Sequence, residues 1–334
     1  MNPIKSACIL AFIFISTKSF AQYTDVINSN RPGVSRSAFS VGTNVVQFEI
    51  GPYIINEKRN PALKTEVDGF GVDFSARYGL IWEPLELNIE GTFQNDTKTY
   101  FSSIPFDEER ANFKTLTIGA KYLVFDPNKN AEEDKPNLYS WKANQGFKWK
   151  YLIPAVAVYA GANYDTKNNP YIAPGIESFS PKVMIMTQNN FSGGWVFVMN
   201  LIKDRIGTDQ SDLSYILTLT HSFSPKWVVF GETQGIKSDF YADNLFRFGG
   251  AYLWTKDFQL DTAVTFNTKD TPSVFSVNFG MSYRLDFHKD KEITNEENGT
   301  SVMQEAERKS RRNNSNKDDD SQDKKPKREA LDFD

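Results

Sequence analysis

Apolar and polar residues alternate with a period of two through most of the chain beyond residue 44. In residues 258–266 the even positions carry Phe, Leu, Thr, Val and Phe, whereas the odd positions carry Gln, Asp, Ala and Thr. The same alternation recurs in residues 273–287 and 85–93. Successive side chains of a strand point to opposite faces of its sheet. The pattern therefore predicts strands with one apolar, aromatic-rich face and one polar face.

Extended over the chain, this pattern predicts about twelve strands. The predicted strands are 45–56, 67–81, 85–95, 113–125, 151–162, 178–189, 194–203, 212–223, 227–236, 244–254, 258–268 and 273–287. Many are long enough for a tilted strand to cross a bilayer, which needs about 9–11 residues. Strands of ordinary globular proteins have about five or six residues. We therefore expect an all-β fold, a transmembrane antiparallel up-and-down β-barrel over residues 45–287.

The connections alternate in length. Tight turns are predicted at 82–84, 190–193, 224–226 and 255–257, and longer polar loops at 96–112, 163–177 and 203–211. Outer-membrane barrels have short periplasmic turns and long extracellular loops. This predicts the outer membrane of a Gram-negative bacterium, with both chain termini in the periplasm. The connection 126–150 is an exception, because it is long yet falls on the short-turn side.

The tryptophans follow the same division. Trp82, Trp195, Trp227 and Trp254 lie at the four tight turns, and the other two lie in 126–150. Indole rings gather where membrane lipid meets water, because they combine an apolar body with a polar edge. We therefore expect an aromatic girdle in contact with outer-membrane lipid. A soluble β-sandwich would give no reason for this distribution.

The two ends differ from the barrel sequence. Residues 1–22 have the charge, apolar run and small-residue site of a signal peptide, cleaved after Ala21 or Gln22. The chain's single cysteine, Cys8, lies within that apolar run, so the mature chain would contain no thiol. Residues 23–44 form a polar N-terminal segment at the periplasmic mouth.

The C-terminal residues 288–334 are dense in charges of both signs and poor in apolar residues. Such a composition cannot bury enough apolar surface to offset the entropy of ordering, so it predicts a disordered periplasmic tail. Its last residues include Leu331 and Phe333, apolar side chains between acidic ones. These two residues could form a short docking peptide for a periplasmic or outer-membrane protein, or belong to a solvated tail.

Charged residues occupy the polar phase of the strands and are predicted to face the lumen. They are Glu49, Asp73, Arg77, Glu86, Glu90, Lys121, Glu232, Arg247, Asp261 and Arg284. Inside a barrel, water and mutual ion pairs can satisfy such groups. One interpretation is a passage or binding site for a polar solute. The other is a salt-bridged interior that closes the barrel.

Other classes of function find little support. The two histidines, His221 and His288, have no nucleophile arranged beside them: Ser222 follows His221, but neighbouring strand residues point to opposite faces. Metal-ligand spacing, a phosphate-binding glycine loop and a dinucleotide fingerprint are missing, so no catalytic residue, metal site or cofactor is predicted. The net charge of −4 argues against nucleic acid as a partner.

Short motifs at the start of the chain resemble those of a known barrel family. Arg31-Pro32, with Ser37 further on, precedes a first strand that contains Gln47-Phe48-Glu49-Ile50-Gly51. This is similar to the opening of the outer-membrane family labelled "transporter" or "MetA-pathway of phenol degradation", whose first strand has the pattern Q-x-E-x-G. The resemblance covers about residues 24–287 and implies a barrel that moves small compounds. Gly33 is a departure, because an acidic residue is common there.

The segment 23–44 is expected to fold into the lumen as a partial plug, with Arg31 and Pro32 at its centre. Arg31 is predicted to pair with an inward carboxylate such as Glu49 or Glu232. The leading functional hypothesis is a channel or transporter for a small solute. The alternative is a non-conducting anchor or assembly component whose tail recruits a partner protein.

Overall fold

The computed structural model describes residues 26–60, 64–80, 82–127, 149–166, 168–172, 178–239 and 241–288. The chain divides into two units, residues 1–288 and 289–334. The predicted signal peptide and the tail with Leu331 and Phe333 lie outside the described residues, as does most of the connection 126–150. In the described ranges, no helix is long and apolar enough to cross a membrane.

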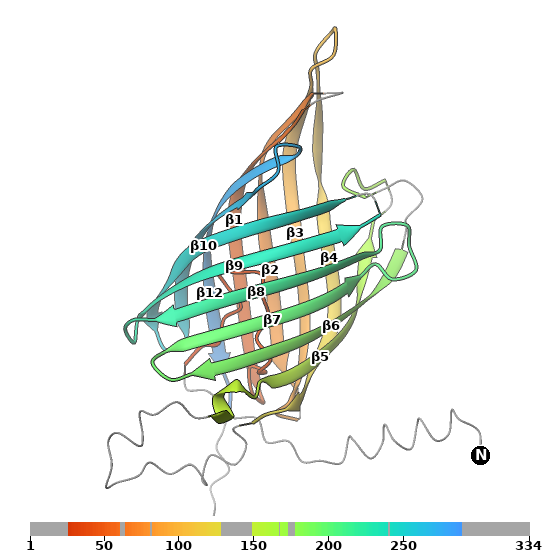
Figure 1. The fold of residues 1–334 in the computed structure, drawn as a ribbon. Coiled ribbons are helices and arrows are strands. Elements are labelled where there is room, and N and C mark those ends of the chain that lie inside the picture. The colour runs from red at the N-terminus through yellow and green to blue at the C-terminus, as the bar shows by residue number, and fades with distance from the viewer. Residues whose placement is uncertain are drawn as a thin grey trace, which may run out of the picture. The chain divides into compact units, whose positions relative to one another are not determined.

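Twelve strands form one closed antiparallel barrel (Figure 1). The strands are β1 (Val45–Arg59), β2 (Thr65–Gly79), β3 (Leu85–Tyr100), β4 (Phe106–Phe125), β5 (Ala155–Asp165), β6 (Ser178–Phe191), β7 (Trp195–Asp204), β8 (Asp212–Ser222), β9 (Trp227–Ser238), β10 (Ala242–Thr255), β11 (Phe258–Asn267) and β12 (Ser273–Asp286). Each strand pairs with its neighbours in sequence, and β12 closes the barrel by pairing with β1 from Val45↔Asp286 to Lys58↔Ser273. The predicted up-and-down barrel is confirmed.

The burial pattern shows which face of the strands points inward. In β11, Asp261, Ala263 and Thr265 are buried, whereas Leu260, Val264 and Phe266, which alternate with them, are exposed. The polar and small residues therefore face the interior, and the apolar residues cover the exterior. This inversion of the soluble-protein pattern is typical of a barrel whose outer surface lies in lipid.

Strands β1, β3 and β4 are longer than the sequence predicted. The predicted loop 96–112 is wrong, because β3 continues to Tyr100 and β4 begins at Phe106. The rings of Tyr100 and Phe106 stack with their centroids 4.6 Å apart, and Thr99 donates a hydrogen bond to Asp107. These cross-strand contacts keep polar residues in the ladder. Figure 1 shows this hairpin reaching beyond the others.

The start of β5 also differs from the prediction. Trp149–Leu152 form a 3-10 turn, η2, and the strand begins only at Ala155. Pro154 has no N–H group to donate to the ladder, which explains the later start.

The barrel has a turn end, where the tight turns lie, and a loop end, where the long hairpins lie. Trp82, Trp195, Trp227 and Trp254 all belong to the turn end, and each is between 42% and 61% exposed. Trp149 of η2 lies there too. Two of the rings are packed on neighbouring strands: Trp195 stacks on His221, and Trp227 lies against Tyr252.

The inner wall is not polar all round. A buried apolar cluster occupies the inward faces of β4–β8, and residue Ala38 packs into it. The cluster consists of Ala38, Leu123, Ala155, Ala157, Tyr159, Met184, Met186, Ile202 and Ile216, with Phe39 packed against it. The predicted charged residues concentrate on the opposite wall. Apolar residues in both phases of 155–161 and 183–186 were the sequence signal for this two-sided interior.

Candidate functional site

Residues 26–44 lie inside the turn end of the barrel, against inward-facing side chains. The segment contains no strand, and it leads directly into β1 through Asn44, whose N–H bonds to Gly79 C=O. Its Ser, Asn, Gly and Pro residues favour turns over a ladder, since they compete for backbone hydrogen bonds or lack a donor. Wall side chains therefore supply most of its partners. We call residues 26–44 the lumen segment.

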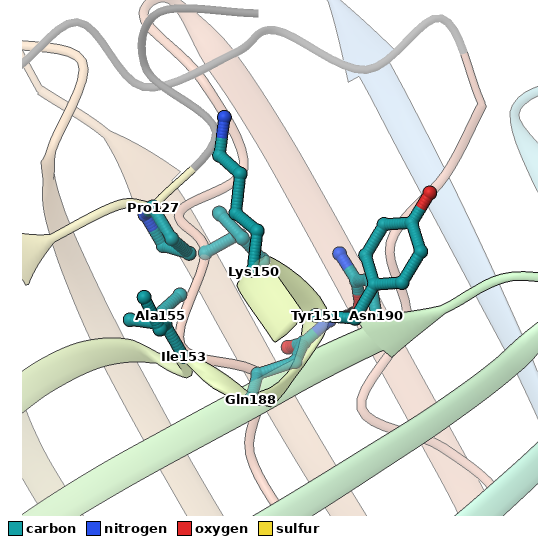
Figure 2. Close-up of a pocket in the computed structure, with 8 residues that line it drawn as sticks. Pro127, Lys150, Tyr151, Ile153, Ala155, Gln188 and Asn190 are labelled. Atoms are coloured by element: carbon teal, nitrogen blue, oxygen red, sulfur yellow. Dashed lines mark hydrogen bonds between the residues drawn. The ribbon is translucent and has the colours of Figure 1, made fainter. Parts of the chain in front are cut away.

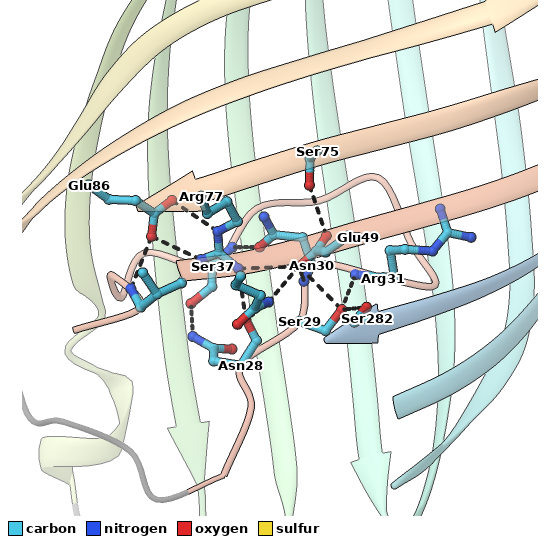
Figure 3. A network of polar contacts seen from close by, with 12 residues as sticks. Asn28, Ser29, Asn30, Arg31, Ser37, Glu49, Ser75, Arg77, Glu86 and Ser282 are labelled. Carbon is cyan, nitrogen blue, oxygen red and sulfur yellow. Dashed lines mark hydrogen bonds and ion pairs between the residues drawn. The ribbon is translucent and has the colours of Figure 1, made fainter. Parts of the chain in front are cut away.

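The lumen segment rests on the first strand through the motif of Gln47, Glu49 and Gly51. Gln47 Nε2 donates to the Asn28 C=O at 3.1 Å. Figure 3 shows Glu49 beside Asn30, whose N–H donates to Glu49 Oε1 at 3.1 Å. At Gly51 an added Cβ would collide with the Arg31 guanidinium. The Q-x-E-x-G pattern thus provides the surface of β1 against which the lumen segment packs around Arg31. This contact gives the spacing of the pattern a physical reason.

Arg31 extends along the wall from β1 past β12 to β11. Its Nη2 lies 3.1 Å from Asp261 Oδ1 and donates to Asn278 Oδ1 at 2.6 Å. Arg31 thus pairs with an inward carboxylate, as predicted, but the partner is Asp261 and not Glu49 or Glu232, the two examples suggested. Glu49 and Glu232 accept from other groups of the segment, whereas glycines at 51 and 280 leave room for the guanidinium beside Asp261.

Glu232 on β9 holds the next part of the segment by its backbone. The N–H groups of Val34 and Ser35 both donate to Glu232, at 3.2 and 3.1 Å. Arg247 Nη1 lies 3.1 Å from the other carboxylate oxygen. An added Cβ at Gly33 would lie 2.5 Å from Glu232 Oε2. An acidic side chain at position 33 would therefore meet this carboxylate, which explains the departure from the family pattern.

A buried charge cluster anchors both the beginning and the later part of the segment. Arg77 donates to both oxygens of Glu86 at 3.0 Å and to the Asn28 C=O at 2.8 Å. Lys121 Nζ lies 3.1 Å from Glu86 and donates to the Phe39 C=O at 2.8 Å. Because two cations share the carboxylate of Glu86 and also bind the segment's carbonyls, the cluster ties the segment to β2, β3 and β4.

Arg36 lies toward the apolar wall and pairs with Glu90 on β3. Its backbone N–H donates to Asn200 Oδ1 at 2.6 Å, and Asn200 Nδ2 returns a bond to the Arg36 C=O. Gln188 accepts from the hydroxyl of Ser37 at 2.8 Å. Sequence reasoning missed Asn200 and Gln188. For Asn200 the signal was an amide between Val198 and Ile202 in the inward phase of β7.

Two of the predicted lumen residues bind other side chains of the wall. Asp73 accepts from Thr92 Oγ1 at 2.6 Å, and Arg284 Nη2 lies 2.7 Å from Asp257 in the turn before β11. Within the described ranges, the other eight predicted residues join contacts that reach residues 26–44 directly or through one partner.

At the loop end, the connection after β5 folds back over β3 and β4. Tyr171 donates its hydroxyl to Asp96 Oδ2 at 3.0 Å, and Asn169 Nδ2 donates to the Phe113 C=O at 2.7 Å. Burial raises the pKa of the Tyr171 phenol, and the hydrogen bond to Asp96 acts in the same direction. The phenol therefore stays protonated and keeps its donor role throughout the physiological range.

Two cavities border the lumen segment. The smaller, of about 10 Å³, lies between η2 and the end of β6, and Figure 2 shows Lys150, Tyr151 and Gln188 around it. That volume approaches the space of a single water molecule. The larger, of about 220 Å³, lies between the segment, including Arg31 and Pro32, and the inner faces of β6–β11. Pro32 follows Arg31 through a cis peptide bond.

The chemistry of these groups is that of binding and charge pairing. In the described part of the chain, no three His, Cys, Asp or Glu side chains gather where they could hold a metal ion. His221 faces outward, where it stacks on Trp195. The interior thus offers hydrogen-bonding groups, paired charges and one cavity of useful size.

Comparison with solved structures finds similar barrels. An outer-membrane channel from Pseudomonas putida F1 is 10% identical, with a TM-score of 0.49 over 78% of this chain and 100% of that one. The KdgM porin is 10% identical, with a TM-score of 0.41 over 71% and 99%. A deltaS2 mutant of the TodX monoaromatic hydrocarbon channel is 11% identical, with a TM-score of 0.42 over 75% and 92%.

Comparison with curated proteins gives no match. A family model matches most of the barrel and the lumen segment. It covers residues 29–285 and carries the description "Putative MetA-pathway of phenol degradation". The chain belongs to this family.

Proposed function

We propose that the protein is an outer-membrane channel for a small solute, and that the lumen segment is a plug that closes its turn end. The apolar exterior and the tryptophans at one end support a place in the membrane. The turn end would face the periplasm, because short turns of such barrels lie there. The mature chain would begin near residue 23, with the plug over 23–44, the barrel over 45–287 and a periplasmic tail over 288–334.

The observation that carries this proposal is the way the plug is held. Residues 26–44 contribute no strand, and the barrel closes without them through the pairing of β12 with β1. The wall grips the plug with side chains such as Glu49, Glu232 and Lys121. Because these contacts are separate from the ladder, the plug can leave while the barrel stays intact.

Single-channel conductance in a planar bilayer tests the proposal. The full-length barrel is compared with a variant that lacks residues 23–44 and with a control that lacks residues 289–334. Heat-modifiable gel mobility establishes that each has folded. We expect rare, brief openings in the full-length protein, steady conductance without the plug, and full-length behaviour without the tail.

Silence in all three folded proteins would contradict the channel. It would favour the alternative, a closed anchor whose tail recruits a partner. Co-purification of periplasmic proteins with the full-length chain, and its loss when residues 289–334 are removed, would then distinguish the anchor from an inert barrel.

A further inference from the structure

The larger cavity has one apolar side and one hydrogen-bonding side. Val196, Val198 and Phe230 line it from β7 and β9, and Thr218 and Thr220 line it from β8. The Thr218 hydroxyl donates to Glu232 Oε2 at 2.7 Å. The other side is the plug itself, from residue 27 to residue 37. A molecule in this space would meet aliphatic and aromatic carbon on one face and hydroxyl and amide groups on the other.

The cavity offers no free charge. Among the residues that line it, Arg31 alone is charged, and its guanidinium is already paired with Asp261, both side chains being at least nine-tenths buried. Glu232 lies nearby but is occupied by Arg247 and by two N–H groups of the plug. An ionised solute would lose its hydration here without gaining a partner, which is strongly unfavourable.

Taking the lumen as a solute path, as proposed above, we infer that this cavity is the binding site for an uncharged, amphipathic small molecule. A cavity of about 150 Å³ lined by apolar side chains accepts benzene. A space of about 220 Å³ therefore accepts a six-membered ring that carries a hydroxyl group. The charged residues that contact the plug serve to hold it, and the solute is selected by shape and neutrality.

The plug forms one wall of this site, so binding and closure are linked. When the plug leaves, the site loses the groups of residues 27–37, and the solute is released toward the turn end. Conversely, a bound solute stabilises the docked plug by mass action. The same segment thus closes the channel and completes its binding site.

The test is a binding measurement on the refolded full-length barrel in detergent, by saturation-transfer NMR titration. The probes are cyclohexanol, cyclohexanecarboxylate and cyclohexylammonium at neutral pH, which share a ring and differ in charge. Val228→Trp fills the cavity, because Val228 lines it. Val229→Trp is the matched control, because Val229 is 46% exposed on the outer face. Heat-modifiable mobility checks folding, and Ala251→Leu replaces Val228→Trp if that variant does not fold.

We expect cyclohexanol to bind the unaltered protein and Val229→Trp equally, and the cavity-filling variant at least ten-fold more weakly. Both charged analogues should bind at least ten-fold more weakly than cyclohexanol. Equal binding by the cavity-filling variant, or by either charged analogue, would overturn the inference. Binding without any conductance would contradict the channel but not this site, whereas conductance without binding would contradict the site alone.

Discussion

Arg31 and Asp261 form an ion pair with 3.1 Å between Nη2 and Oδ1, although they lie 230 positions apart in the chain. The pair joins the plug to β11, and its guanidinium lies beside two strand glycines, Gly51 and Gly280. Both side chains are almost fully buried. The barrel wall therefore provides a specific site for this ion pair.

Asp261→Asn should loosen the plug. The substitution keeps the size of the side chain but removes its charge, so Arg31 loses a charge-assisted bond of about 1.5–3 kcal/mol. We expect the open probability in planar bilayers to rise about ten-fold or more. Asp68→Asn is the control, since Asp68 pairs with Asn56 at an exposed site. An open probability unchanged by Asp261→Asn would show that this pair does not hold the plug.

Gly33→Ala should expose the plug to protease. Its new Cβ would lie 2.5 Å from Glu232 Oε2, so the bonds from Val34 and Ser35 to that carboxylate would be lost or lengthened. We expect trypsin to cut after Arg36 at least five-fold faster than in the unaltered protein, as followed by mass spectrometry.

Gly231→Ala is the matched control for this experiment, because an added Cβ there would meet only the ring of Phe248, at 3.3 Å. Cleavage after Arg36 should keep its original rate in that variant. If both glycine variants were cut at the same rate, the close approach at Gly33 would have no part in docking the plug.

More of the fold than of the site could be predicted from the sequence. Period-two alternation gives the strand number and the inward phase, because one residue of slip would expose the polar face to lipid. The alternation could not locate the end of β3, because polar residues such as Thr99 are equally compatible with a loop and with a hairpin exposed to water. The partner of Arg31 also escaped prediction. Several inward carboxylates were available as partners. The path of the plug backbone decides which of them Arg31 reaches, and no sequence pattern reveals that path.

Arg77→Met should destabilise the whole barrel. Arg77 is fully buried between Glu86 and Glu49, so its removal leaves two carboxylates with fewer cations, although Lys121 still pairs with Glu86. Breaking a buried ion pair from one side costs about 3–5 kcal/mol. We expect a clearly lower urea midpoint for unfolding from liposomes, followed by tryptophan fluorescence.

Arg59→Met provides the comparison for this loss. Arg59 pairs with Glu57 near the loop end and is 55% exposed, so its loss should cost less than about 1 kcal/mol. Equal midpoints for the two variants would mean that the Arg77 cluster contributes to plug docking but not to barrel stability.

The tryptophans at the turn end should report a single depth in the membrane. Trp195 and Trp254 are 42% and 61% exposed on the outer surface of the barrel, at the ends of their strands. Indoles at the lipid–water boundary are quenched more by lipids brominated near the head group than by lipids brominated near the bilayer centre. We expect this order for the unaltered protein and for variants that retain only one of the two rings.

Stronger quenching from the bilayer centre would place the turn end inside the hydrocarbon and would require a different assignment of the membrane-spanning part of the strands. Quenching by neither lipid would place these rings, and the turn end with them, away from the membrane.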